Sequence, residues 1–127
     1  MEKALELQKR TKQFAIAIIN LCRDLPRTEE ARVIGAQLLR SATSIAANYR
    51  AACRGRSRAE FAAKLGIAVE EADETVFWLE LLHEAEILRG SDHQHALKEA
   101  NELLAIFASS QITLRTRVKM TKPQMDK

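Results

Sequence analysis

The sequence predicts an all-α protein, an antiparallel up-and-down four-helix bundle with short loops. Three observations support this fold class: the 127 residues include only four glycines and two prolines, apolar side chains recur at spacings of three and four, and residues that start or stop helices divide the chain into four segments. Because each predicted link is only a few residues long, consecutive helices should run in opposite directions.

The first two helices are bounded by start and stop residues. The first is expected over residues 3–24, because apolar residues repeat there at three and four and Pro26 follows. The second should begin after Thr28, an N-cap residue followed by two glutamates. It is expected to continue to about residue 54, where Gly55 stops it.

Capping boxes mark the start of the third and fourth helices. Ser57, with Glu60 three residues later, opens the third helix, which should reach about Leu88. Ser91 repeats the device with a glutamine three residues later, and the fourth helix should fade near Arg117.

The predicted bundle occupies residues 1–117 as one domain, and residues 118–127 are expected to form a disordered basic tail, because they show no periodicity. The chain has no run of about eighteen apolar residues and no secretory signal, which predicts a cytoplasmic protein with no membrane partner.

Cys22 and Cys53 should lie roughly 35 Å apart, too far for a disulfide. Free thiols fit a reducing compartment.

The net charge of +3 conceals an uneven distribution along the chain. Residues 31–59 contain six arginines and no acid, whereas residues 60–86 contain eight acids and one lysine. Residues 111–127 sum to +4. These counts predict a basic second helix, an acidic third helix and a basic tail.

Four arginines of the second helix fall on its outward side, within a stripe about 80° wide at 100° per residue. Such a stripe could follow the phosphates of a nucleic acid, because guanidinium groups bind phosphate in a bidentate manner. Alternatively, the stripe meets acidic residues of another helix or subunit. With bases of the tail, the candidate nucleic-acid-binding residues are Arg32, Arg40, Arg50, Arg54, Arg115, Arg117 and Lys119.

Small polar residues interrupt the second helix at Ser41, Ser44 and Asn48. Ser41 and Asn48 lie at the margin of the predicted core stripe, where a neighbouring helix approaches closely and each polar group needs a hydrogen-bond partner. We interpret these residues as structural, with a ligand or partner contact as the alternative.

The third helix is apolar on two sides, and one bundle can cover only one of them. This pattern predicts self-association, with acids on the flanks of the helix facing arginines of a neighbouring second helix. The predicted oligomer-interface residues are Ala63, Ile67, Phe77, Trp78 and Leu81.

No constellation in the sequence supports an enzymatic site. Glu80 and His83 form the Glu-x-x-His motif of di-iron bundles, but that chemistry also needs glutamates from the other helices, and the second helix has none within residues 31–54. His93 and His95 complete no zinc spacing, and phosphate-loop and nucleophile motifs are absent. We expect no catalytic residue, metal, cofactor or small-molecule substrate; a metal-dependent enzyme centred on Glu80 and His83 is the least favoured alternative.

Two runs of the chain, "LLRSATSIAANYRAA" and "RSRAEFAAKLGIAVEEADETVFWLELL", resemble a family of bacterial four-helix bundle proteins. This family was first noticed as reading frames inside intervening sequences of 23S ribosomal RNA genes, and its members are therefore often labelled ribosomal proteins. It includes the accessory variability determinant proteins of diversity-generating retroelements. The resemblance covers about residues 5–115. Its most specific residues are Arg40, Ser41, Ser44, Ile45, Asn48, Ser57, Glu60 and Phe61.

The resemblance implies an antiparallel bundle that assembles into a homopentameric ring. Accessory members of the family look like basic adaptors for RNA and a reverse transcriptase, whereas most others have no assigned activity. The leading hypothesis is a non-enzymatic, ring-forming cytoplasmic protein that binds RNA, DNA or a nucleic-acid-processing protein. The alternative is a structural oligomeric module without nucleic-acid binding.

Overall fold

The computed structural model describes residues 2–125, which contain four α-helices and no strand. The all-α prediction is confirmed, and none of these four helices combines the length and the apolar character needed to cross a membrane. The helices are α1 (Glu2–Arg23), α2 (Glu29–Cys53), α3 (Arg58–Glu84) and α4 (Ser91–Met125).

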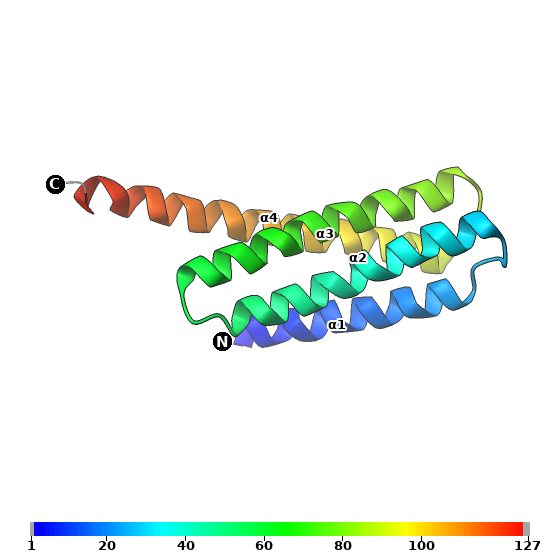
Figure 1. Cartoon of the computed structure of the whole chain (residues 1–127), viewed down its shortest axis with the longest axis horizontal. Helices are drawn as coiled ribbons and strands as arrows, with labels where there is room; N and C mark the ends of the chain where they lie inside the picture. The colour runs from blue at the N-terminus through cyan, green and yellow to red at the C-terminus, as the bar shows by residue number, and fades with distance from the viewer. Residues whose placement is uncertain (1, 126–127) are drawn as a thin grey trace.

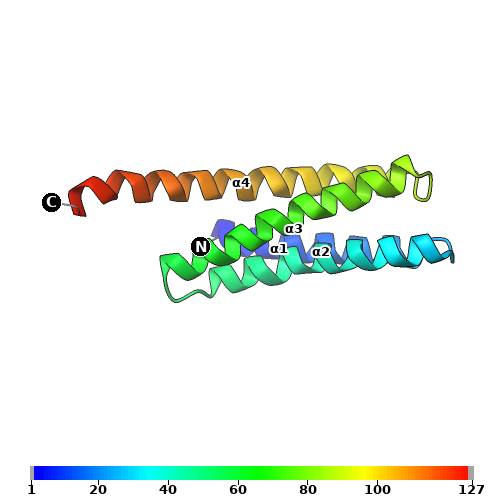
Figure 2. The same ribbon diagram turned by 45° about the horizontal axis from the view of Figure 1, so that its top comes forward.

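The helices pack around one core, and the chain reverses direction at each connection (Figure 1). The turned view in Figure 2 shows the same arrangement. α2 contacts α1 and α3, and α4 contacts α3 and α1. Because the α1–α4 contact is the least extensive of the four, the side of the bundle between these two helices is the most open.

Side chains cap α2 and α3 at the starts predicted from the sequence. The Thr28 hydroxyl accepts a hydrogen bond from the backbone N–H of Ala31 at 3.2 Å, and the Ser57 hydroxyl accepts one from Glu60 at 3.1 Å. The Glu60 carboxylate in turn accepts the N–H of Arg56 at 2.6 Å. These bonds satisfy N–H groups at and beside the helix starts, so the sequence sets both starts locally.

α3 ends at Glu84, which is about a turn before the end predicted near Leu88. Glu86 has a positive φ of 60°, which stops the helix, and the N–H groups of Ile87 and Leu88 both return to the Leu82 carbonyl. Leu88 therefore belongs to the loop after α3, and its side chain reaches the core from that loop and not from the helix. Apolar periodicity cannot distinguish these two ways of reaching the core.

α4 continues to Met125, past the end predicted near Arg117. Residues 118–125, predicted as part of a disordered tail, instead continue this helix, and residues 126–127 lie outside the described range. Between Gly90 and residue 123 the sequence contains neither glycine nor proline, so no helix breaker stops α4 earlier.

The outer end of α4 projects past the ends of the other three helices (Figure 1). We call residues 111–125 the α4 extension. Ile112, near its start, is one of the exposed large apolar residues of the protein. Within residues 111–117, Ile112, Thr113 and residues 115–117 are exposed, so the bundle covers little of this part of the extension.

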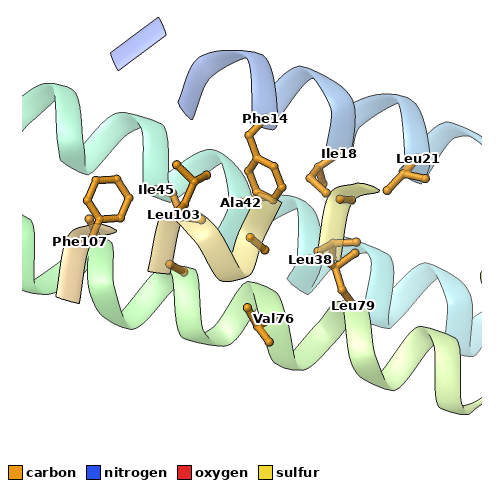
Figure 3. Close-up of a cluster of buried hydrophobic side chains, with 14 of the residues drawn as sticks. Phe14, Ile18, Leu21, Leu38, Ala42, Ile45, Val76, Leu79, Leu103 and Phe107 are labelled. Atoms are coloured by element: carbon orange, nitrogen blue, oxygen red, sulfur yellow. The ribbon is translucent and has the colours of Figure 1, made fainter. Parts of the chain in front are cut away.

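Aliphatic and aromatic side chains from all four helices form the core (Figure 3). The Tyr49 and Phe107 rings join α2 to α4, with ring centroids 5.2 Å apart. Burying one large apolar side chain contributes about 1.5–3 kcal/mol, so this cluster dominates the stability of the fold. Its fully buried members include Ile18, Leu38, Ile45, Leu65, Leu79, Leu82, Leu103 and Phe107.

Both cysteines are half-buried free thiols. The Cys22 sulfur lies 3.6 Å from the carbonyl oxygen of Gly35, and burial raises the pKa of the Cys22 thiol. Cys22 is thus held in its neutral form as a small packing group between α1 and α2.

Replacing Leu38 with Ala should lower the free energy of unfolding by about 2–5 kcal/mol, because truncating this fully buried side chain leaves a cavity. Urea denaturation followed by circular dichroism measures the change. The matched control is Leu5→Ala on α1, a side chain that is 63% exposed. It should cost less than about 0.5 kcal/mol. Equal losses in the two variants would contradict this description of the core.

Candidate nucleic-acid and oligomer interfaces

Four exposed arginines gather where α2 passes to α3, at the end of the molecule from which α4 projects (Figure 1). We call this group, Arg50, Arg54, Arg56 and Arg58, the basic end. Within residues 2–125 no ion pair joins these side chains to an acid. The α4 extension, which projects from the same end of the molecule (Figure 1), has four bases and no acid. Arg56 and Arg58 were not among the predicted site residues, because they lie beyond the end of the helical stripe.

Arg32 lies far from the basic end. It precedes Arg54 by 22 residues on α2, which is about 33 Å along a helix axis. Its own end of the bundle is not basic: residues 20–36 carry three bases and three acids, and residues 80–98 carry two bases and four acids. The predicted stripe is therefore not one compact phosphate-binding site.

Arg40 is paired within its own chain. Its guanidinium lies 3.1 Å from the Glu71 carboxylate and also donates to the Glu74 carboxylate, both on α3. The hydrogen bond to Glu74 is the largest cause of a raised pKa of Arg40, and Arg40 in turn holds the pKa of Glu74 below its ordinary value. Of the two possibilities given for the arginine stripe, Arg40 therefore fits the second one: it contacts acids of another helix.

The Arg40 pair extends to the aromatic residues of the predicted oligomer interface. The Trp78 indole N–H donates to the same Glu74 carboxylate at 3.0 Å, and the Phe77 ring packs edge-on against Trp78 with centroids 4.9 Å apart. Trp78 is half-buried, whereas Phe77 is 52% exposed. The ion pair therefore orients an aromatic pair whose outer member faces solvent.

The other predicted interface residues also lie outside the fully buried core. Ala63 is exposed, and Ile67 and Leu81 are half-buried. The outer side of α3 is thus only partly covered by its own bundle, and the partner that would cover it stays a prediction.

The small polar residues of α2 find partners inside the bundle. Ser41 is fully buried; its hydroxyl donates to the Leu38 carbonyl at 3.2 Å and accepts from the Thr75 hydroxyl of α3 at 2.8 Å. The Asn48 amide donates back along α2 to the carbonyl and hydroxyl of Ser44, at 2.9 and 2.8 Å. These contacts satisfy the polar groups without a ligand. Sequence reasoning missed Thr75, because its partner lies on another helix.

A groove of about 620 Å³ lies between α1 and α4 on the open side of the bundle. We call it the α1–α4 groove; four acids and two bases are among its lining residues. Arg10 of α1 bridges the two helices there through Glu99 at 2.6 Å and Glu102 at 2.9 Å. No sequence motif marks the groove, because it arises where one pair of helices packs less closely than the others.

His83 of α3 and His93 of α4 contact each other. His83, exposed on α3, stacks on the buried His93 of α4 with ring centroids 5.1 Å apart, and Nε2 of His93 lies 2.7 Å from the Leu79 carbonyl oxygen. In the part of the chain that the structure describes, no group of three or more His, Cys, Asp or Glu side chains is placed to hold a metal ion. The Glu80 and His83 motif therefore lacks the ligands of a di-metal centre in that part.

The fold and these surfaces define a class of protein: an all-α four-helix protein with separate basic and aromatic surfaces. A model of the 23S rRNA-intervening sequence protein family matches residues 3–109, and this chain belongs to that family. It is also similar to a crystal structure from Bacteroides thetaiotaomicron VPI-5482, described as a protein with unknown function from the S23 ribosomal protein family. The two are 36% identical with a TM-score of 0.78, over 86% of this chain and 97% of that chain. No curated protein matches the sequence.

The fluorescence of Trp78, the only tryptophan in the chain, should report protonation of Glu74. Because the hydrogen bond from Arg40 lowers the pKa of Glu74, the pair stabilises the fold above the ordinary carboxylate pKa and is lost as pH falls through the lowered one. In Arg40→Gln the midpoint of the fluorescence titration should move to higher pH. Arg50→Gln is the matched control and should not shift it. An unchanged midpoint in Arg40→Gln would disprove the coupling.

Proposed function

We propose that this protein is a non-enzymatic, self-associating adaptor that binds RNA through its basic end. The observation that carries the proposal is the gathering of four exposed arginines where α2 passes to α3, with no acid partner in residues 2–125. Guanidinium groups bind phosphate in a bidentate manner, and neutralising backbone phosphates releases counterions. The phosphate backbone of a nucleic acid is the ligand that suits this surface.

The charge of α3 and of the turn that leads into α4 agrees with binding at the basic end. Residues 65–79 of α3 carry four acids and no base, and residues 80–98 carry four acids and two bases. These regions repel phosphate, so a nucleic acid is directed to the basic end and away from the outer side of α3. RNA and DNA share the phosphate backbone, and we favour RNA because of the resemblance to family members that look like RNA adaptors.

A homopentameric ring, implied by the same resemblance, would strengthen this binding. Rotation about a single axis leaves every basic end at the same height on the ring. Several basic ends can then contact one RNA, and linked contacts raise the overall affinity without any new contact.

Replacing Arg50, Arg54 and Arg58 with Gln should weaken RNA binding and its dependence on salt. For single strands, the slope of log K against log salt is about 0.7 per phosphate contact, so losing three contacts should reduce it by about 2. Fluorescence anisotropy with a labelled single-stranded RNA, repeated over a range of salt concentrations, measures this slope. A DNA of the same sequence tests whether the surface prefers RNA.

The matched control replaces Arg23, Arg27 and Arg32 with Gln at the opposite end of the bundle. All three side chains are exposed. The control therefore removes the same three positive charges as the first variant but leaves the basic end intact. The control should leave the salt slope unchanged. If the two triple variants weakened binding equally, net charge alone would explain the binding and the proposed site would be wrong.

A structural oligomeric module without nucleic-acid binding is the second candidate. It is favoured by Arg40, whose guanidinium is paired with acids of α3, and by the exposed Phe77. The acidic flank of α3 and the arginines of α2 in a second copy are complementary in charge. A second copy of the chain is therefore the partner that suits the outer side of α3.

Replacing Phe77 with Ser should lower the molar mass measured by size-exclusion chromatography with light scattering, because it removes the exposed aromatic contact. The matched control is Ile16→Ser on α1, which alters a side chain of nearly the same exposure, 51%. The control should keep the wild-type mass. An unchanged mass in Phe77→Ser would exclude this surface as a contact between copies.

A further inference from the structure

The α1–α4 groove is a cavity that the proposed function does not use. Phe14 and Ala17 of α1 give it an apolar lining, and acids outnumber bases in its walls. Two of those acids already share Arg10, whereas Asp24 and Asp92 make no ion pair within residues 2–125. The groove therefore suits an occupant that is both apolar and basic.

The α4 extension has both properties. Ile112 is 62% exposed, and Arg115 is exposed as well. Residues 111–125 carry four bases and no acid. Because the extension is already helical, docking it orders little further backbone, which keeps the entropic cost of binding low.

The extension and the groove also match in length. The α1 side of the groove runs from Arg10 to Asp24, about 21 Å at 1.5 Å per residue, and residues 111–125 span about the same distance. The extension cannot reach its own groove, because the lining residues on α4 fall within residues 92–102 and the extension leaves the bundle at the opposite end of that helix (Figure 1). Only another copy can supply it.

The geometry points to a head-to-tail contact in which the α4 extension of one copy lies in the α1–α4 groove of a second copy. Ile112 would cover the apolar lining, and Arg115 would meet Asp24 or Asp92. Such a contact joins two different surfaces, so it repeats, and it closes into a ring where the rotation between copies allows. The inference rests on the proposed self-association and assigns the extension to a second copy instead of RNA.

Two variants, each lacking one side of the contact, test this inference by size-exclusion chromatography with light scattering. The extension variant carries Ile112→Asp and Arg115→Glu, and the groove variant carries Ala17→Arg; all three positions are exposed, so the fold is retained. Each variant alone should have a lower mass than the wild type. Mixed in equal amounts, they supply one intact groove and one intact extension, and the mass should double relative to either variant alone.

The matched control is Ile16→Arg, which places the same side chain beside Ala17 but outside the groove, and it should keep the wild-type mass. The inference is overturned if the extension variant keeps the wild-type mass, or if mixing raises no mass above that of the separate variants. An extension variant that keeps its mass but loses RNA binding would assign the extension to RNA. The proposed function is tested independently of this contact: it is wrong if the triple variant at Arg50, Arg54 and Arg58 binds RNA as the wild type does.

Discussion

The seam between α2 and α3 sets the register on which every surface of the protein depends. At its centre the buried hydroxyls of Ser41 and Thr75 meet at 2.8 Å, and at its outer edge Arg40 binds two glutamates of α3. Sliding one helix past the other would break this hydrogen bond between buried hydroxyls, which contributes about 0.5–1.5 kcal/mol, although each hydroxyl would keep a carbonyl of its own helix within hydrogen-bond distance. The exposed ion pair contributes at most about 1 kcal/mol, so it orients Trp78 more than it stabilises the fold.

Features that depend on neighbouring residues could be predicted from the sequence, and features that depend on distant ones could not. Thr28 and Ser57 start helices because their hydroxyls bond N–H groups three residues away. The end of α3 depends on how Leu88 reaches the core, and the partner of Arg40 lies 31 and 34 residues further along the chain. Residue spacing within one helix contains no information about where α3 ends or which residue pairs with Arg40.

The candidate site illustrates the same limit. The helical stripe correctly placed Arg50 and Arg54 on an exposed side of α2. Arg56 and Arg58 follow within four residues of Arg54, but they lie past the end of the helix, so a search along one helical face does not include them. The α1–α4 groove has no signature in the sequence, because it reflects the least extensive contact between helices. Surface charge could be counted from the sequence, whereas its separation along the long axis required the fold.

That axial separation of charge constrains how copies of the chain can assemble. A two-fold arrangement that faced two basic ends toward each other would oppose like charges, whereas a head-to-tail contact brings a basic extension against an acidic groove. A closed ring would nevertheless hold the basic ends at one height, where their like charges repel across the ring. A bound polyanion neutralises that repulsion, so RNA binding and ring closure would favour each other by the same free energy. Salt would screen both of these proposed interactions, and it would therefore act on one coupled equilibrium of assembly and binding.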